Sequence, residues 1–131
     1  MVRGPLENAL VNVLGNQPAS SPQVLETLTR LLGADPSAFV RERTARELWE
    51  MGIDKEPEIA QAVPSLTRAL SDQAPGVRAQ AAKALQAIGA PAQSAIPELE
   101  RCVTREQGSV AQDCAHALAA VRAGKTGAET P

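Results

Sequence analysis

The chain has 131 residues, of which 44% are hydrophobic but only 2% aromatic, so its apolar mass is Ala, Leu and Val, which favours close-packed helices over β-sheets. Thirteen Lys and Arg against fifteen Asp and Glu give a net charge of −2, which argues against nonspecific binding to nucleic acid or membranes. No apolar run approaches the ~20 residues that cross a bilayer and the N-terminal segment lacks the features of a signal peptide, so we expect a cytoplasmic protein.

Seven helices are predicted in chain order, with boundaries uncertain by about 2 to 4 residues. Pro64 and Pro97 fall near helix starts, where a missing N–H costs little. Gly52 and Gly89, with Pro57 and Pro91 a few residues later, are expected to cap the helices that they end. Residues 123–131 are small and polar, which predicts a disordered tail. The predicted helices cover residues 5–15, 22–33, 37–52, 58–71, 75–89, 92–105 and 108–123.

The sequence repeats a pattern of two helices three times. The segment that starts at Val40 recurs 37 residues later at Val77 and, less completely, 33 residues further on at Val110. Counting from each Val, the first two copies share Arg at +1, Ala at +5, Leu at +8, Met or Ile at +11 and Gly at +12, whereas the third copy has lost the Arg and the Gly. A second helical pattern precedes each copy, so that the units span residues 22–52, 58–89 and 92–122.

This pattern resembles the HEAT repeat, particularly the short prokaryotic kind found in phycobilisome lyases, over residues 22–122. The resemblance implies an all-α fold, a right-handed α-solenoid of about three helical hairpins whose second helices line the concave side. We expect a single domain over residues 1–122, in which residues 5–15 form an N-terminal capping helix. Elementary physics agrees, because one helix pair cannot bury its apolar stripe and neighbouring units must therefore stack.

A repeated acid and base pair supports the alignment of the units. Asp35 and Asp72 precede the repeat arginines Arg41 and Arg78 by six residues, and the third unit has Arg105 in place of the aspartate and Ala111 in place of the arginine. An aspartate at the turn can cap the second helix or pair with an arginine of a neighbouring unit. The alternative is a turn aspartate and a solvent-facing arginine with no coupling. Under the first interpretation, replacing Asp72 by Ala destabilises the fold.

A basic row is predicted on the outward side of the second helices. Arg46, Lys83 and His116 occupy the same position in the three units, and Arg43 lies one turn before Arg46. The row is a candidate site for an acidic protein segment or phosphates, but nearby glutamates can pair with the arginines, which is typical of an ordinary solvated surface. Trp49 stands where the other units have small or polar residues, so it is either a contact anchor or a cover over a gap against the capping helix.

The sequence contains few residues that are suited to catalysis, metal binding or cofactor binding. Cys102 and Cys114 match neither a CxxC motif nor a zinc spacing and are expected to be reduced thiols that serve as small core residues. Phe39, next to Val40, is also expected in the core. His116 is the only histidine, and no glycine-rich phosphate loop is present, so no catalytic site, metal site or cofactor is predicted.

The expected function is therefore that of a noncatalytic, monomeric interaction module. Such a scaffold, adaptor or regulatory subunit binds a protein partner along its second-helix face. The alternatives are an accessory subunit of a lyase, which needs aromatic and acidic pocket residues, and a protein related to DNA repair, which needs a basic groove. The sequence shows neither clearly.

Overall fold

The computed structural model describes residues 22–54 and 58–129, so the capping helix expected at residues 5–15 lies outside the described residues. No strand occurs in these two ranges. The elements, in chain order, are α2 (Pro22–Ala34), α3 (Ala38–Ile53), the 3₁₀ helix η1 (Ile59–Ala62), α4 (Val63–Ala69), α5 (Pro75–Ile88), the 3₁₀ helix η2 (Ala90–Ala95), α6 (Ile96–Arg105) and α7 (Gly108–Glu129).

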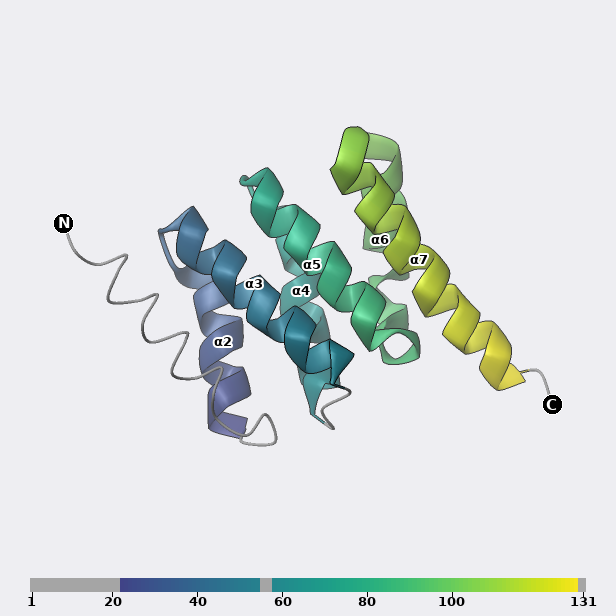
Figure 1. Ribbon diagram of the computed structural model, residues 1–131, viewed down its shortest axis with the longest axis horizontal. Helices are drawn as coiled ribbons and strands as arrows, with labels where there is room; N and C mark the ends of the chain where they lie inside the picture. The colour runs from purple at the N-terminus through teal and green to yellow at the C-terminus, as the bar shows by residue number, and fades with distance from the viewer. Residues whose placement is uncertain (1–21, 55–57, 130–131) are drawn as a thin grey trace.

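The helices form two layers of stacked hairpins. In Figure 1 the second helices of the units, α3, α5 and α7, run side by side in the same direction, and the first helices, α2, α4 and α6, lie behind them. Contacts between successive units follow this order, because α3 packs on α5 and α5 packs on α7. The described chain is therefore an all-α solenoid, as the sequence predicted.

The core is built from the repeat positions. Val40 and Val77 are fully buried at the start of their second helices, and Leu48 and Leu85 are fully buried two turns later. Their counterpart in the third unit, Leu118, is only half-buried. The difference arises because α5 covers α3 and α7 covers α5, whereas no further described hairpin covers α7.

The first helices of the second and third units begin differently from the prediction. Pro64 and Pro97 lie in the first turns of α4 and α6, as expected, but the residues before them form the 3₁₀ helices η1 and η2 instead of α-helix. Proline has no N–H to donate to the carbonyl four residues earlier. The residue before each proline donates its N–H to the carbonyl three residues earlier, so that Val63 bonds to Ala60 and Ile96 bonds to Gln93.

The two predicted capping glycines behave differently. Gly89 ends α5 with a φ of 73° and donates its N–H to the carbonyl of Leu85, a conformation that glycine adopts at little cost. Gly52 instead lies inside α3, where it is buried, and Asp54 caps the helix. An added Cβ at Gly52 would lie 3.0 Å from the Cβ of Ala87, so this glycine allows α3 and α5 to approach closely.

The last helix is longer than predicted. Residues 123–129, assigned from the sequence to a disordered tail, continue α7 to Glu129. The third unit has Arg122 where the first two have their repeat glycine, so no capping residue interrupts the helix at this point. Beyond it alanine, lysine and glutamate favour helix while Gly124 and Gly127 disfavour it, and the next proline is residue 131.

Candidate interaction surface

An ion pair joins the first two units at their turns. Arg41 of α3 donates from Nε to Asp72 Oδ2 (2.8 Å) and from Nη2 to Asp72 Oδ1 (3.0 Å), a bidentate pair between neighbouring hairpins. The two side chains are only 15% and 12% exposed. Arg41 also donates to the backbone carbonyl of Asp35 in its own turn (2.9 Å), while the Asp35 carboxylate accepts the N–H of Ser37 (2.8 Å). Asp35 therefore shapes its own turn, and Asp72 joins two units.

The pair changes the acidity of both partners. Burial disfavours the charged form of Asp72, but hydrogen bonds from Arg41 and from the N–H of Ala74 outweigh it and hold the pKa of the Asp72 carboxyl below its ordinary value. The hydrogen bond to Asp72 raises the pKa of Arg41. The Asp72 carboxyl of the folded protein is therefore ionised at every pH at which an aspartate in the unfolded chain is ionised.

The third unit continues these contacts with a different acid. Arg78 lies 2.8 Å (Nε to Oε2) and 3.2 Å (Nη2 to Oε1) from the carboxylate of Glu106, and its Nη1 donates to the carbonyl of Asp72 (2.8 Å). The inference that the third unit had lost its acceptor was wrong, because the acid has moved one residue along, next to Arg105. Arg105 adds a second link by donating to the carbonyl of Leu70 (3.0 Å) at the end of α4. The same turn-edge contacts therefore join all three units.

The two cysteines form a disulfide. Cys102 of α6 and Cys114 of α7 are bonded with their Cα atoms 6.1 Å apart, and both are fully buried. The expected core position is correct, but the expected reduced state is wrong. The repeat contained the missed signal: the cysteines replace Ala69 and Ala81 of the second unit, which are buried on the two helices of one hairpin. Hairpin packing brings such positions together, although their spacing in sequence matches no known motif.

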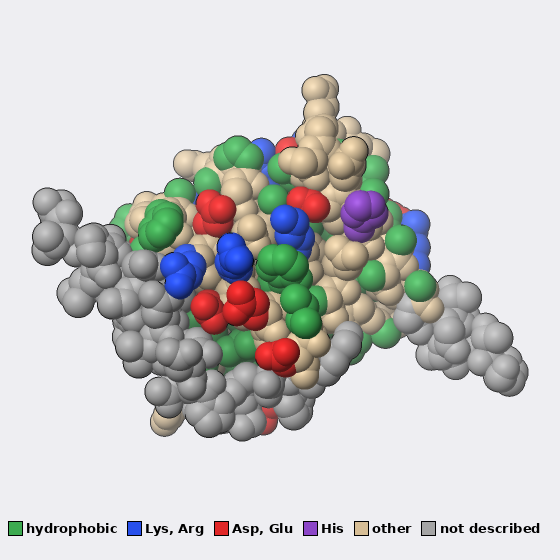
Figure 2. Space-filling view, in the orientation of Figure 1, with side chains coloured by type: hydrophobic (Ala, Val, Ile, Leu, Met, Phe, Trp, Pro, Cys, Tyr) green, Lys and Arg blue, Asp and Glu red, His purple; other side chains and the backbone are tan. Residues whose placement is uncertain are grey.

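The residues of the predicted basic row lie on the layer of second helices. Arg46 on α3 and His116 on α7 are exposed, whereas Lys83 on α5 is half-buried. Figure 2 shows basic side chains over α3 and α5 and the histidine over α7, with acidic side chains on both sides of the basic ones. The face is therefore of mixed charge.

The arginines of this face have acidic neighbours. Arg46 Nε lies 3.6 Å from Glu50 Oε2, an exposed pair that contributes about 0.5 kcal/mol. Burial, and then the nearby charge of Glu50, raise the pKa of the Glu47 carboxyl, while Arg43 and Arg46 act in the opposite direction. The charges of α3 are thus largely balanced along the helix itself.

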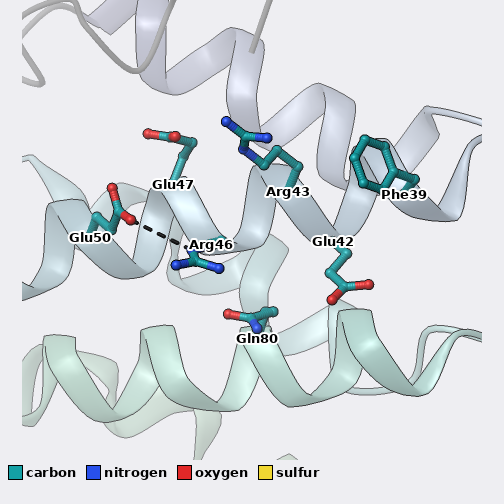
Figure 3. Close-up of a pocket in the computed structure, with 7 residues that line it drawn as sticks. All are labelled: Phe39, Glu42, Arg43, Arg46, Glu47, Glu50 and Gln80. Atoms are coloured by element: carbon teal, nitrogen blue, oxygen red, sulfur yellow. Dashed lines mark ion pairs between the residues drawn. The ribbon is translucent and has the colours of Figure 1, made fainter. Parts of the chain in front are cut away.

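A groove of about 550 Å³ follows the outer side of α3. In Figure 3 Gln80 points from α5 towards α3, between Glu42 and Arg46, while Phe39 and Arg43 lie on the other side of α3. Phe39 is 59% exposed, so its predicted place in the core was wrong. The other units have Gly76 and Ser109 at this position, which already indicated a surface site. The groove is lined by Phe39, Glu42, Arg43, Arg46, Glu47, Glu50 and Gln80.

Trp49 lies between the core and the surface. It is half-buried and packs against the hydrophobic core from its place on α3. The Nζ atom of Lys83 lies 5.6 Å from the centre of the indole ring, a cation–π contact between the first and second units. The contact-anchor role stays a prediction, and the alternative, a cover against the capping helix, concerns residues outside the described ranges.

The arrangement of hairpins agrees with the comparison with known families, in which residues 25–119 match the family model for HEAT repeats. The chain belongs to the HEAT-repeat family. No curated protein matches the sequence. HEAT repeats are commonly protein-interaction modules and are typically noncatalytic.

The second-helix layer of this HEAT-repeat chain carries both apolar and charged side chains (Figure 2). Within residues 22–54 and 58–129, no group of three or more His, Cys, Asp or Glu side chains is placed to hold a metal ion. In the same residues, no helix combines the length and the apolar character that crossing a bilayer requires. The features that remain on the second-helix layer are the mixed-charge groove, the exposed Phe39 and the contact between Trp49 and Lys83.

Proposed function

We propose that this HEAT-repeat protein is a noncatalytic interaction module that binds a protein partner along α3, α5 and α7. The groove beside α3 carries the proposal, because it combines about 550 Å³ of space with an exposed aromatic side chain and closely spaced charges of both signs. The ion pairs that join the units lie elsewhere, at the turns, where Arg41 and Arg78 are engaged. The second-helix face is thus left for a partner.

The charge of the groove narrows the choice of partner. Its lining carries three glutamates against two arginines, so it offers little attraction to a uniformly acidic segment or to the DNA backbone. Lys83, whose described contact is the ring of Trp49, and His116 lie beyond the groove on α5 and α7. A partner with both apolar and charged side chains fits this face better, with its acidic part on the side of α5.

The proposed role is that of a small scaffold, adaptor or regulatory subunit that acts as a monomer. A cytoplasmic location, expected from the sequence, requires the buried disulfide between Cys102 and Cys114 to persist in a reducing compartment. Disulfides are more typical of oxidising compartments. The bond between Cys102 and Cys114 therefore favours an oxidising compartment. Alkylation of thiols in protein taken directly from the native host would measure the oxidised fraction.

Charge reversal tests the binding face. The variant carries Arg46→Glu and Lys83→Glu, and its matched control carries Arg30→Glu and Arg68→Glu on the first helices α2 and α4, where both arginines are exposed. Tagged wild-type, variant and control proteins would be recovered from the native host, and their partners quantified by mass spectrometry. We expect the variant to lose about 90% of a specific partner that the control retains, a change of about 1.4 kcal/mol in binding.

Equal recovery of that partner by the variant, or equal loss in the control, would refute the proposed face. Circular dichroism of all three proteins would show whether the charge changes leave the helices intact. A copurifying pigment or tight DNA binding would instead favour a lyase accessory subunit or a protein related to DNA repair.

A further inference from the structure

The α3–α5 seam has a regular register. An added Cβ at Gly76 would meet the carboxylate of Glu42, and Lys83 lies over Trp49; the two residues of each pair are 34 positions apart. The same offset places Ile53 beside Ala87, and the tight approach of Gly52 to Ala87 agrees with it. The C-terminal end of α3 is therefore held against α5 by small residues.

Two large apolar side chains lie at this end of α3. Trp49 and Ile53 are four residues apart, so they lie on the same side of the helix. Ile53 is 55% exposed, and Trp49 is half-buried. Figure 2 shows hydrophobic side chains together over this part of α3, next to a basic side chain. An exposed isoleucine beside a tryptophan is a ready contact for an apolar group of a partner.

Lys83 supplies the charge beside this apolar contact. Arg41, Arg46 and Arg78 each lie within 4 Å of a carboxylate, whereas the described contact of the Lys83 ammonium is the face of the Trp49 ring. An ammonium carries three N–H donors, and contact with one ring face leaves part of them for another acceptor. Lys83 can therefore donate a hydrogen bond to a carboxylate of a partner without losing its contact with Trp49.

We propose that Trp49, Ile53 and Lys83 form an anchor for a partner segment in which a large apolar side chain lies two residues from a single carboxylate. This proposal rests on the proposed function and specifies its partner. In an extended segment, side chains two residues apart lie on the same side, ~6.6 Å apart along the chain. The apolar side chain packs against Trp49 and Ile53 while the carboxylate reaches Lys83.

The acidic residues beside the anchor favour a partner that has a single carboxylate, placed on the side of α5. Glu50 is already paired with Arg46, and Asp54 is exposed at the C-terminal end of α3, one residue beyond Ile53. A second carboxylate on the Asp54 side of the anchor would meet a like charge. The acidic residue of the partner therefore lies towards α5. Further carboxylates in a uniformly acidic segment add no affinity at the anchor.

Intrinsic fluorescence provides the test, because Trp49 is the only tryptophan in the chain. The probe is the synthetic peptide acetyl-Ser-Leu-Ser-Glu-Ser-amide, titrated into the full chain and followed by Trp49 fluorescence and by amide NMR shifts. Matched peptides replace Leu by Ser or Glu by Gln. We expect saturable binding at millimolar or lower concentration, weakened about fivefold or more by either peptide change.

Protein variants complete the test. Lys83→Gln should bind the Leu-Glu peptide no better than wild type binds the Leu-Gln peptide, and Ile53→Ser should abolish the preference for Leu over Ser. Arg68→Gln on α4 is the charge control and should bind like wild type. Amide NMR shifts report on binding independently of any change that Lys83→Gln makes to tryptophan emission.

Absence of saturable binding by the Leu-Glu peptide up to 10 mM, about the weakest affinity of interest, or equal binding of all peptides, would overturn the anchor. If the peptide does not bind but the variant with Arg46→Glu and Lys83→Glu still loses a specific partner from the native host, the anchor is wrong and the proposed function stands. Loss of peptide binding in Arg68→Gln would also contradict the assignment, because that side chain lies on the other layer.

Discussion

Replacing Asp72 by Ala should destabilise the solenoid far more than a surface substitution does. The carboxylate accepts two hydrogen bonds from Arg41 and one from the N–H of Ala74, and it is mostly buried. A hydrogen bond to a charged group contributes about 1.5–3 kcal/mol, and an abandoned buried charge adds to the loss. Arg41 keeps its bond to the Asp35 carbonyl and is 15% exposed, which reduces the penalty. We expect a loss of about 2–4 kcal/mol.

The assay is urea unfolding at neutral pH followed by circular dichroism. The control is Gln86→Ala, an exposed position on α5, which should change the free energy of unfolding by less than about 0.5 kcal/mol. Equal unfolding free energies for Asp72→Ala and Gln86→Ala would refute the role of the pair in joining the units.

The contribution of Asp72 should also depend on pH. Because its pKa is lower in the folded state than in the unfolded chain, its stabilisation is fully present above the unfolded value of ~4 and is lost as the pH falls through the folded value. The difference in unfolding free energy between wild type and Asp72→Asn should therefore shrink below about pH 4. A difference that stays constant down to pH 2, about two units below the unfolded pKa, would contradict the assigned shift.

Two further predictions concern the packing of the hairpins. Replacing both Cys102 and Cys114 by Ala, or reducing their disulfide, should cost about 3 kcal/mol in urea unfolding, because the bond closes a short loop between positions 12 residues apart; wild type that is unaffected by reductant would contradict the pairing. Gly52→Ala should cost about 1–2 kcal/mol, since its new Cβ would lie 3.0 Å from that of Ala87. The matched Gly33→Ala, with nothing within 4 Å, should stabilise α2 by about 0.5–1 kcal/mol, and thermal or urea unfolding that ranks the two variants in the opposite order would exclude the tight approach at Gly52.

The ion pairs and the disulfide that stabilise this solenoid lie apart from most of the proposed binding surface. The turn-edge pairs and the disulfide join helices that are already in contact, and on the proposed surface the contact of Lys83 with Trp49 also joins the first two units, whereas Ile53 is exposed. Substitutions at the proposed anchor, such as Ile53→Ser, should therefore alter binding without unfolding the chain. The variants that test stability and the variants that test binding are therefore independent of each other.

Much of the fold was predictable from the sequence because the apolar pattern of each helix is local and is repeated. Val40 and Val77 mark equivalent buried positions, and the segments with Pro57 and Pro91 separate the units. The pairing of Arg41 with Asp72 was among the alternatives that the repeat spacing left open, and the hydrogen bonds decide between them. The repeat therefore predicted the units and their order.

The remaining features depend on the register between helices, which no local pattern contains. The bond between Cys102 and Cys114, the contact of Lys83 with Trp49 and the substitution of Glu106 for the missing aspartate all arise where one helix meets another. Phe39 is exposed although it adjoins a buried valine, because the side chain of a helical residue points about 100° away from that of its neighbour. The sequence thus determined which helices form and which faces they bury, whereas only stacking, whose contact energies depend on distances between residues far apart in the chain, decided which side chains meet.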